Sequence, residues 1–202
     1  DALRLGRILA GLAPEEPEVH GLVALMEIQA SRLRARVGRD GEPVLLPDQD
    51  RTRWDRILIG RGLAALARSE ELGGALGPYA LQAAIAACHA RAATAHETDW
   101  TRIAALYEAL SRVSPSPVVE LNRAVALGKA FGPEAGLALA DDLVGVPALA
   151  QYHLLPAVRA EFLTQLGRTD EARAELERAI ALTRNEGERR LLSARIARLA
   201  PA

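Results

Sequence analysis

The chain has 202 residues, of which half are apolar and only 3% aromatic, with a formal net charge of −1. This length can bury a sizeable core, and the abundance of Ala and Leu favours packed helices over a β-sandwich. The near-zero net charge disfavours direct DNA binding by this segment, because binding to nucleic acid without sequence preference depends on an excess of basic residues.

Cysteine content and hydropathy indicate the compartment. Cys88 is the single cysteine, and no apolar run reaches the length of a membrane span. No signal-peptide pattern precedes the first helical pattern, which begins almost at once after Asp1. We therefore expect a cytoplasmic protein with no membrane contact, and we interpret the chain as a segment of a longer polypeptide.

The N-terminal part predicts two helices followed by an irregular segment. Apolar residues at helical spacing over 3–12 predict a first helix that ends at Pro14. Pro17 suits the first turn of a second helix, whose apolar face continues over 19–37. Glycine and proline make residues 38–46 irregular.

The stretch PDQDRTRWD at 47–55 concentrates three aspartates, two arginines, a glutamine and a tryptophan. We call it the joint, because it connects the N-terminal helices to a helix predicted over 53–72. Charged residues at such a position either brace the structure or present a binding surface, and both interpretations stay open here.

The structural interpretation assigns caps and an anchor. Asp48 or Asp50 caps the helix start, Asp55 favours the first turn through the helix dipole, and Trp54 anchors the core. Capping leaves three residues of the joint unexplained, namely Gln49, Arg51 and Arg53.

A calcium loop is the tempting alternative, since Asp48, Asp50 and Thr52 occupy its first, third and fifth positions. The match stops there. The sixth position is Arg53 where glycine is needed, and the twelfth is Ile59 where a bidentate glutamate is needed. We expect no metal at the joint.

Internal repeats give the clearest organisational signal. Three segments share small and apolar residues at the same spacing, at 99–115, 132–147 and 169–184. Each is preceded by a further helical pattern, at 79–94, 118–130 and 153–166. The pairs resemble tetratricopeptide repeats, although their spacing is divergent.

The last helix, predicted over 186–199, suits the polar cap that closes a repeat array. Four apolar residues are expected on its inner face, namely Leu191, Leu192, Ile196 and Leu199. The fold prediction is therefore all-α, a tetratricopeptide-like helical repeat array (α-solenoid) with an N-terminal helical subdomain. The expected domains are 1–47, a motif loop and connecting helix at 48–77, and repeats with the capping helix at 78–202.

Catalytic and metal-binding patterns are weak. Cys88 and His89 are adjacent on a helix and point about 100° apart, so they cannot pair as nucleophile and base. A metal cluster of His89 and His96 with Glu97 and Asp99 lacks further ligands. Phosphate-binding glycine loops and a nucleophile elbow are absent from the sequence. We expect no enzyme activity and no cofactor.

Asn122 and Arg123, in SPVVELNRA, lie on a predicted first helix of a repeat. First helices line the concave groove of such arrays, where an amide and a guanidinium suit an extended peptide. A hydrogen bond between neighbouring repeats explains the pair equally well.

Seven stretches together resemble one bacterial family nearly end to end, and the most specific are PDQDRTRWD and SPVVELNRAVAL. The family is the tetratricopeptide-like C-terminal extension of extracytoplasmic-function RNA polymerase sigma factors. Its motif corresponds to Asp48, Gln49, Asp50, Arg51, Arg53, Trp54 and Asp55, with Thr52 where serine is expected.

The resemblance implies a non-catalytic regulatory module that modulates transcription initiation through contacts with the sigma domains, RNA polymerase or a partner protein. In that family the sigma domains precede the extension. Two alternatives stay open: a receptor for a peptide or small molecule in the repeat groove, and, less favoured by the sequence, a hydrolytic enzyme. As partner-binding candidates we name the joint residues together with Asn122 and Arg123.

Overall fold

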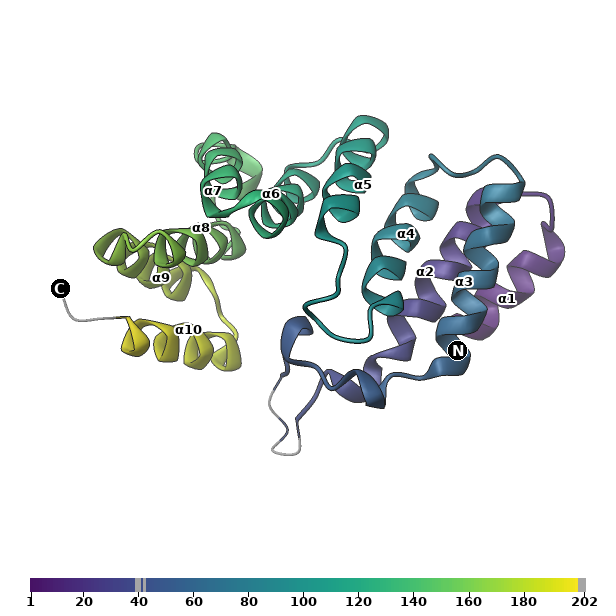
Figure 1. The fold of residues 1–202 in the computed structure, drawn as a ribbon, viewed down its shortest axis with the longest axis horizontal. Coiled ribbons are helices and arrows are strands. Elements are labelled where there is room, and N and C mark those ends of the chain that lie inside the picture. The colour runs from purple at the N-terminus through teal and green to yellow at the C-terminus, as the bar shows by residue number, and fades with distance from the viewer. Residues whose placement is uncertain (39–40, 42, 200–202) are drawn as a thin grey trace. The chain divides into compact units, whose positions relative to one another are not determined.

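The computed structural model describes residues 1–38, 41 and 43–199, and this part of the chain is all-α, with ten α-helices, four short 3-10 turns and no β-strand (Figure 1). It divides into two compact units, 1–114 and 115–202. The domain boundaries expected at 47/48 and 77/78 both lie inside the first unit.

The first unit contains five α-helices and three 3-10 turns: α1 (Ala2–Leu12), α2 (Pro17–Ser31), η1 (Leu33–Ala35), η2 (Leu46–Asp48), η3 (Arg51–Arg53), α3 (Arg56–Glu71), α4 (Pro78–Arg91) and α5 (Trp100–Val113). The prediction of a first helix over 3–12 and of Pro17 in the first turn of the second is confirmed. The irregular character of 38–46 holds for its described residues up to η2, while residues 39, 40 and 42 lie outside them.

The predicted continuation of the second helix to Val37 is wrong. The helix ends at Ser31, where the backbone N–H of Asp55 donates to the Ser31 carbonyl oxygen at 2.8 Å. The Ser31 hydroxyl also donates to the carbonyl oxygen of Ile28 at 2.6 Å. Tertiary contact with the joint and local side-chain bonding therefore replace further helical turns.

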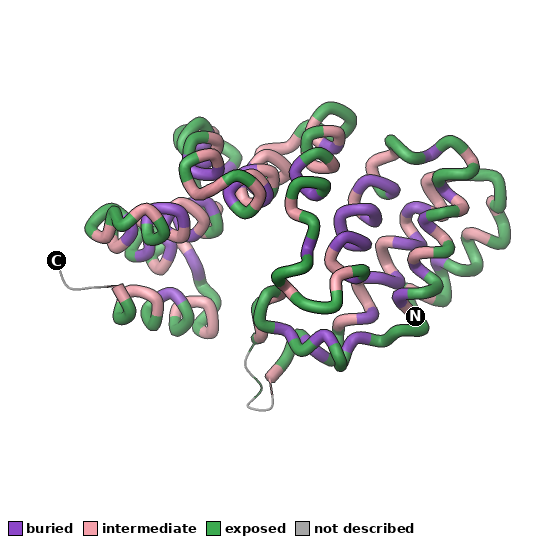
Figure 2. The backbone as a smooth tube through the Cα atoms, in the orientation of Figure 1, coloured by how far each residue is buried: buried purple, intermediate pink, exposed green. Residues whose placement is uncertain are grey.

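Helix α4 is the buried centre of the first unit, and Figure 2 shows it as a largely buried segment. Its alanines let α2, α3 and α5 pack closely around it. Gly21 on α2 marks a close approach to α4, because a Cβ there would lie 2.7 Å from the backbone nitrogen of Ala80. The small side chains of the sequence thus serve dense helix packing.

The second unit contains α6 (Pro117–Phe131), α7 (Pro133–Asp142), η4 (Pro147–Leu149), α8 (Leu154–Gln165), α9 (Thr169–Leu182) and α10 (Glu186–Arg198). Each α-helix from α6 to α9 packs against the α-helix that follows it. Phe162 on α8 fills a notch made by Gly128 and Gly136, where an added Cβ would lie 2.2 Å and 2.4 Å from its ring. These two glycines are therefore required by packing.

Ion pairs join three helices of this unit. The guanidinium of Arg159 on α8 contacts the carboxylate of Asp141 on α7, at 2.8 Å, and that of Glu175 on α9.

On α10, Leu192 is buried and Ile196 and Leu199 pack against the core, but Leu191 is exposed, so its predicted inward position is wrong. The helix turns by about 100° per residue, so the rotation that buries Leu192 leaves Leu191 beyond the edge of the packed face.

None of the helices in the described part of the chain is long and apolar enough to cross a membrane.

Candidate functional site

The joint folds into two 3-10 turns followed by a capped α-helix. Asp50 caps η3, since its carboxylate accepts from the Thr52 backbone N–H at 2.9 Å and the Thr52 hydroxyl at 2.6 Å. These hydrogen bonds from Thr52 lower the pKa of Asp50. The cap of α3 is Asp55, which accepts from the N–H groups of Ile57 and Leu58. Asp48 lies exposed in η2, so the prediction that Asp48 or Asp50 caps this helix is corrected to Asp55.

Arg51 is buried inside the first unit rather than displayed. Its guanidinium donates to the carbonyl oxygens of His89 at 2.6 Å and Ala92 at 2.8 Å, and to the hydroxyl of Thr98 at 3.1 Å. The two carbonyls belong to the C-terminal end of α4, where backbone acceptors have no helical partner and the helix dipole favours a cation. Burial lowers the pKa of Arg51, an effect that the charge of Glu97 opposes.

Trp54 and Gln49 hold the joint from within. The Trp54 ring is buried in the core with α4, and the Arg51 guanidinium lies 5.1 Å from its centroid. The Gln49 side chain is buried and donates to the carbonyl oxygen of Val44 at 3.1 Å. The expectation that Trp54 anchors the core is confirmed. Gln49 and Arg51, which capping did not explain, form hydrogen bonds that brace the joint from inside.

Sequence reasoning missed Glu18, which satisfies the other end of α4. Its carboxylate accepts from the N–H groups of Tyr79 at 2.8 Å and Ala80 at 3.1 Å, while the local N-cap, Gly77, offers no side chain. The bond joins residues more than sixty positions apart. The only sequence signal was that a Gly-Pro helix start lacks a capping side chain of its own.

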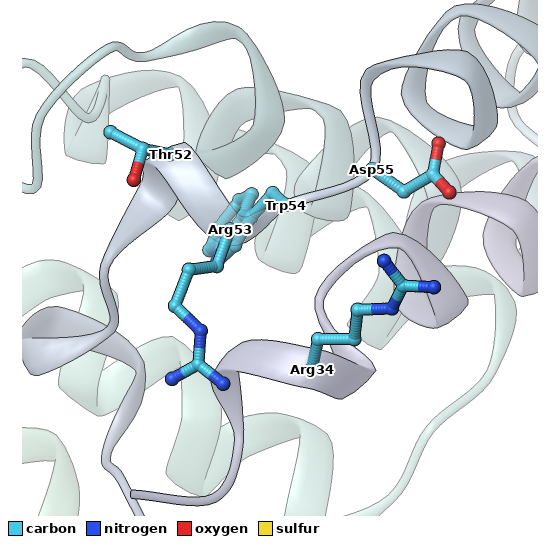
Figure 3. A pocket seen from close by; sticks show the side chains of 5 residues that line it. All are labelled: Arg34, Thr52, Arg53, Trp54 and Asp55. Atoms are coloured by element: carbon cyan, nitrogen blue, oxygen red, sulfur yellow. The ribbon is translucent and has the colours of Figure 1, made fainter. Parts of the chain in front are cut away.

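The outer side of the joint borders an open depression of about 530 Å³, lined by Arg34, Thr52, Arg53, Trp54 and Asp55 (Figure 3). Arg34 comes from η1, which packs against η3, so Arg34 and Arg53 line the same depression. No hydrogen bond or ion pair joins either guanidinium to another described residue, although Arg53 is close enough to Asp50 for its charge to help lower the pKa of that carboxyl. The sequence pattern continues the second helix through Arg34, because it does not reveal the turn between α2 and the joint.

His89 and Cys88 are used for packing. The His89 ring meets Trp100 edge to face at 5.2 Å between ring centroids. Burial, with the nearby charges of Arg51 and Arg32, lowers the pKa of His89 to about 4. Burial raises the pKa of the Cys88 thiol. The described residues hold no group of three or more His, Cys, Asp or Glu side chains arranged to bind a metal ion.

Asn122 and Arg123 lie on α6 in the second unit. Asn122 is exposed, and the Arg123 guanidinium lies 2.9 Å from the Glu120 carboxylate one turn earlier. Arg123 therefore has a partner within its own helix, whereas Asn122 faces solvent. Both remain candidates, and they belong to a different unit from the joint.

Comparison with known proteins finds one family model that matches part of the chain and one similar protein. Residues 1–70, which include the whole joint and most of α3, match a family model described as "Family of unknown function (DUF6596)". The chain is also similar to an uncharacterized protein of Rhizobium meliloti (strain 1021), with 49% identity over 188 residues. The match covers 93% of this chain and 44% of that protein, so the chain spans less than half the length of its relative. No solved structure matches the chain.

Proposed function

We propose that this chain is a non-catalytic regulatory module of a bacterial extracytoplasmic-function sigma factor, which modulates transcription initiation through protein contacts. The proposal rests on the sequence resemblance around PDQDRTRWD and SPVVELNRAVAL. It is supported by a relative much longer than the aligned region, since such a protein has further chain for the module to contact. The expected partners are the sigma domains, RNA polymerase or both.

The observation that carries a protein-contact role is an exposed apolar stripe on α1. Leu5, Ile8, Leu9 and Leu12 are 65%, 46%, 41% and 78% exposed, at the spacing that places them on one helix face. The opposite side of α1 packs on α2 through the buried Gly6. Contiguous exposed apolar surface typically marks a contact with another protein.

The size of the stripe favours a partner in the same polypeptide. A stable complex between separate proteins buries about 800 Å² on each partner, far more than four side chains supply. A small contact becomes effective when the two parts are covalently linked, because the linkage raises their effective concentration. We therefore assign the stripe to contact with the sigma domains.

The test is a promoter-reporter assay on the full-length factor carrying Leu5→Ser with Leu9→Ser. Reporter output should change severalfold, because the substitutions remove apolar contact area without disturbing a buried position. The matched control is Leu76→Ser with Phe131→Ser, since both residues are exposed apolar positions that do not belong to α1. Wild-type output from an equally abundant Leu5/Leu9 variant would remove the support that the stripe gives to the proposal.

We also propose that α4 to α9 form three divergent tetratricopeptide-like pairs closed by α10. The repeated sequence spacing supports this, as does the packing of α-helix against successive α-helix within the second unit. In such arrays stability depends on the nearest neighbour. Removing α10 by truncation after Thr183 should speed hydrogen exchange in α8 and α9 and leave α2 to α4 protected. Uniform loss of protection throughout the chain would argue against an array.

A peptide receptor is the second candidate, and the exposure of Asn122 favours it. Loss of an amide hydrogen bond to a bound peptide should weaken binding by about 1–2 kcal/mol in Asn122→Ala, with little change in melting temperature. Arg123→Ala is less informative, because it also breaks the pair with Glu120. A large loss of stability in Asn122→Ala would indicate a packing role instead.

A further inference from the structure

The depression beside the joint combines features of a site for carboxylates. Arg34 and Arg53 lie on the lining of the same opening, and neither is paired with a described residue. A guanidinium binds a carboxylate through two parallel hydrogen bonds, which is its strongest and most directional pairing. Two such groups beside one opening can hold two acidic side chains of a single ligand.

We propose that this depression binds an acidic segment of a protein partner, with Arg34 and Arg53 each pairing with a carboxylate. The inference rests on the proposed function, because it assigns a chemistry to a partner of the same module. It concerns a surface separate from the α1 stripe, so the two can be tested independently.

Asp55 argues for a peptide rather than a small free anion. Asp55 lies on the lining, so its negative charge opposes any anion there unless the ligand also offers it a hydrogen-bond donor. One of its oxygens already accepts from Ile57 and Leu58, while the other retains acceptor capacity for an N–H group. A peptide supplies a backbone N–H donor next to each acidic side chain, so a single segment can pair with the arginines and donate to Asp55.

The volume and rigidity of the site agree with this ligand. A depression of about 530 Å³ is in the range of small-ligand pockets and exceeds the need of a single inorganic anion. The backbone that carries Arg53 is held by buried Trp54 and Arg51 on either side. Because this backbone is already ordered, ligand binding costs less conformational entropy than binding to a flexible loop would.

The direct experiment measures binding of fluorescein-labelled, end-capped hexaglutamate to the 202-residue chain by fluorescence anisotropy. Hexaglutamine serves as the neutral probe. Arg34→Ala and Arg53→Ala should each weaken hexaglutamate binding about tenfold, the effect of losing one charge-assisted pair. Arg61→Ala is the matched control, since Arg61 is exposed on α3 and outside the lining. Its affinity should stay close to wild type.

Three results would overturn the inference. They are unchanged binding in Arg34→Ala and Arg53→Ala, equal weakening in Arg61→Ala, and displacement of hexaglutamate by inorganic phosphate at a comparable concentration. The last would indicate a free-anion site. Circular dichroism melting confirms that each variant is folded, and Arg53→Lys should retain part of the affinity because it keeps the charge.

The outcome is separable from the proposed function. Hexaglutamate binding to the isolated chain requires no sigma domain, so Leu5→Ser with Leu9→Ser should leave it unchanged. If the reporter depends on the α1 stripe but hexaglutamate does not bind, only the acidic-segment inference is overturned. If hexaglutamate binds but the α1 substitutions do not change reporter output, the acidic-segment site is supported and the contact of α1 with the sigma domains is not.

Discussion

The guanidinium of Arg51 donates a 2.6 Å hydrogen bond to the backbone carbonyl oxygen of His89, across 38 positions of sequence. At the other end of the same helix, the Glu18 carboxylate accepts from the N–H groups of Tyr79 and Ala80. The buried α4 thus has an acidic group at its positive end and a basic group at its negative end, both from other elements. The hydrogen bonds of Arg51 to the end of α4 fix the position of the joint, so variants at the joint differ in stability according to whether they keep these bonds.

Arg51→Ala should lower the free energy of unfolding by about 3 kcal/mol, because it leaves two α4 carbonyls and the Thr98 hydroxyl without their donor in a buried site. Urea denaturation of the isolated chain measures this. Arg53→Ala is the control, since Arg53 is exposed two residues later. Equal stability of the two variants would contradict the bracing role.

Functional tests of the joint should leave the buried Arg51 unchanged. The combination Asp48→Ala with Arg51→Ala would confuse loss of a contact with loss of folding, because Arg51 is buried. Asp48→Ala with Arg53→Ala changes exposed positions of the same motif and leaves the brace intact. Whether the exposed residues touch the sigma domains stays a prediction.

Glu18→Ala should destabilise the chain by about 1–2 kcal/mol, since the N-terminus of α4 would lose its only side-chain cap among the described residues. Glu18→Gln should cost less, because an amide oxygen still accepts. Gly77→Ala should resemble Glu18→Ala, as the added Cβ would lie 2.1 Å from the Glu18 carboxylate. Urea denaturation compares the three variants; a harmless Gly77→Ala would show that the cap can shift.

His89 predicts a pH dependence of stability below neutrality. Its pKa is about 4 in the folded chain, against the ordinary histidine value of 6.5 when the chain is unfolded, so between these values the unfolded state binds more protons. Stability is therefore fully present above about pH 6.5 and falls as the pH drops toward 4, by about 2 kcal/mol at pH 5 from this group alone.

The control for this prediction is His89→Phe, which keeps an aromatic ring against Trp100 but cannot titrate. Unfolding free energies at about pH 7.5 and about pH 5 should differ by about 2 kcal/mol less in the variant than in wild type. The same pH dependence in both chains would assign it to other groups.

Gly128→Ala and Gly136→Ala should each destabilise the second unit by about 1–3 kcal/mol, because the added methyl group overlaps the Phe162 ring. Combining either change with Phe162→Leu should recover part of the loss, since the smaller side chain leaves room. A double-mutant cycle by thermal denaturation measures this coupling. Strict additivity would mean that the ring and the glycines do not share one space.

Local patterns in the sequence were enough to predict several elements of this protein. Proline positions and 3.6-residue periodicity indicated where α1 and α2 begin, and Ala-rich spacing indicated close packing around α4. Trp54 was expected to anchor the core because it begins the apolar helical spacing of the third helix, and it is buried. These features depend on neighbours within one or two turns, which a sequence displays directly.

Tertiary structure alone decided how the joint residues are used. Whether Arg51 is a surface group or a buried cap depends on the position of the α4 C-terminus, and the partner of Glu18 lies at the other end of the same helix. That Arg34 and Arg53 line the same depression likewise depends on α2 ending at Ser31. The sequence shows which hydrogen bonds a polar side chain can make. Which partner it bonds depends on how segments distant in the sequence pack together.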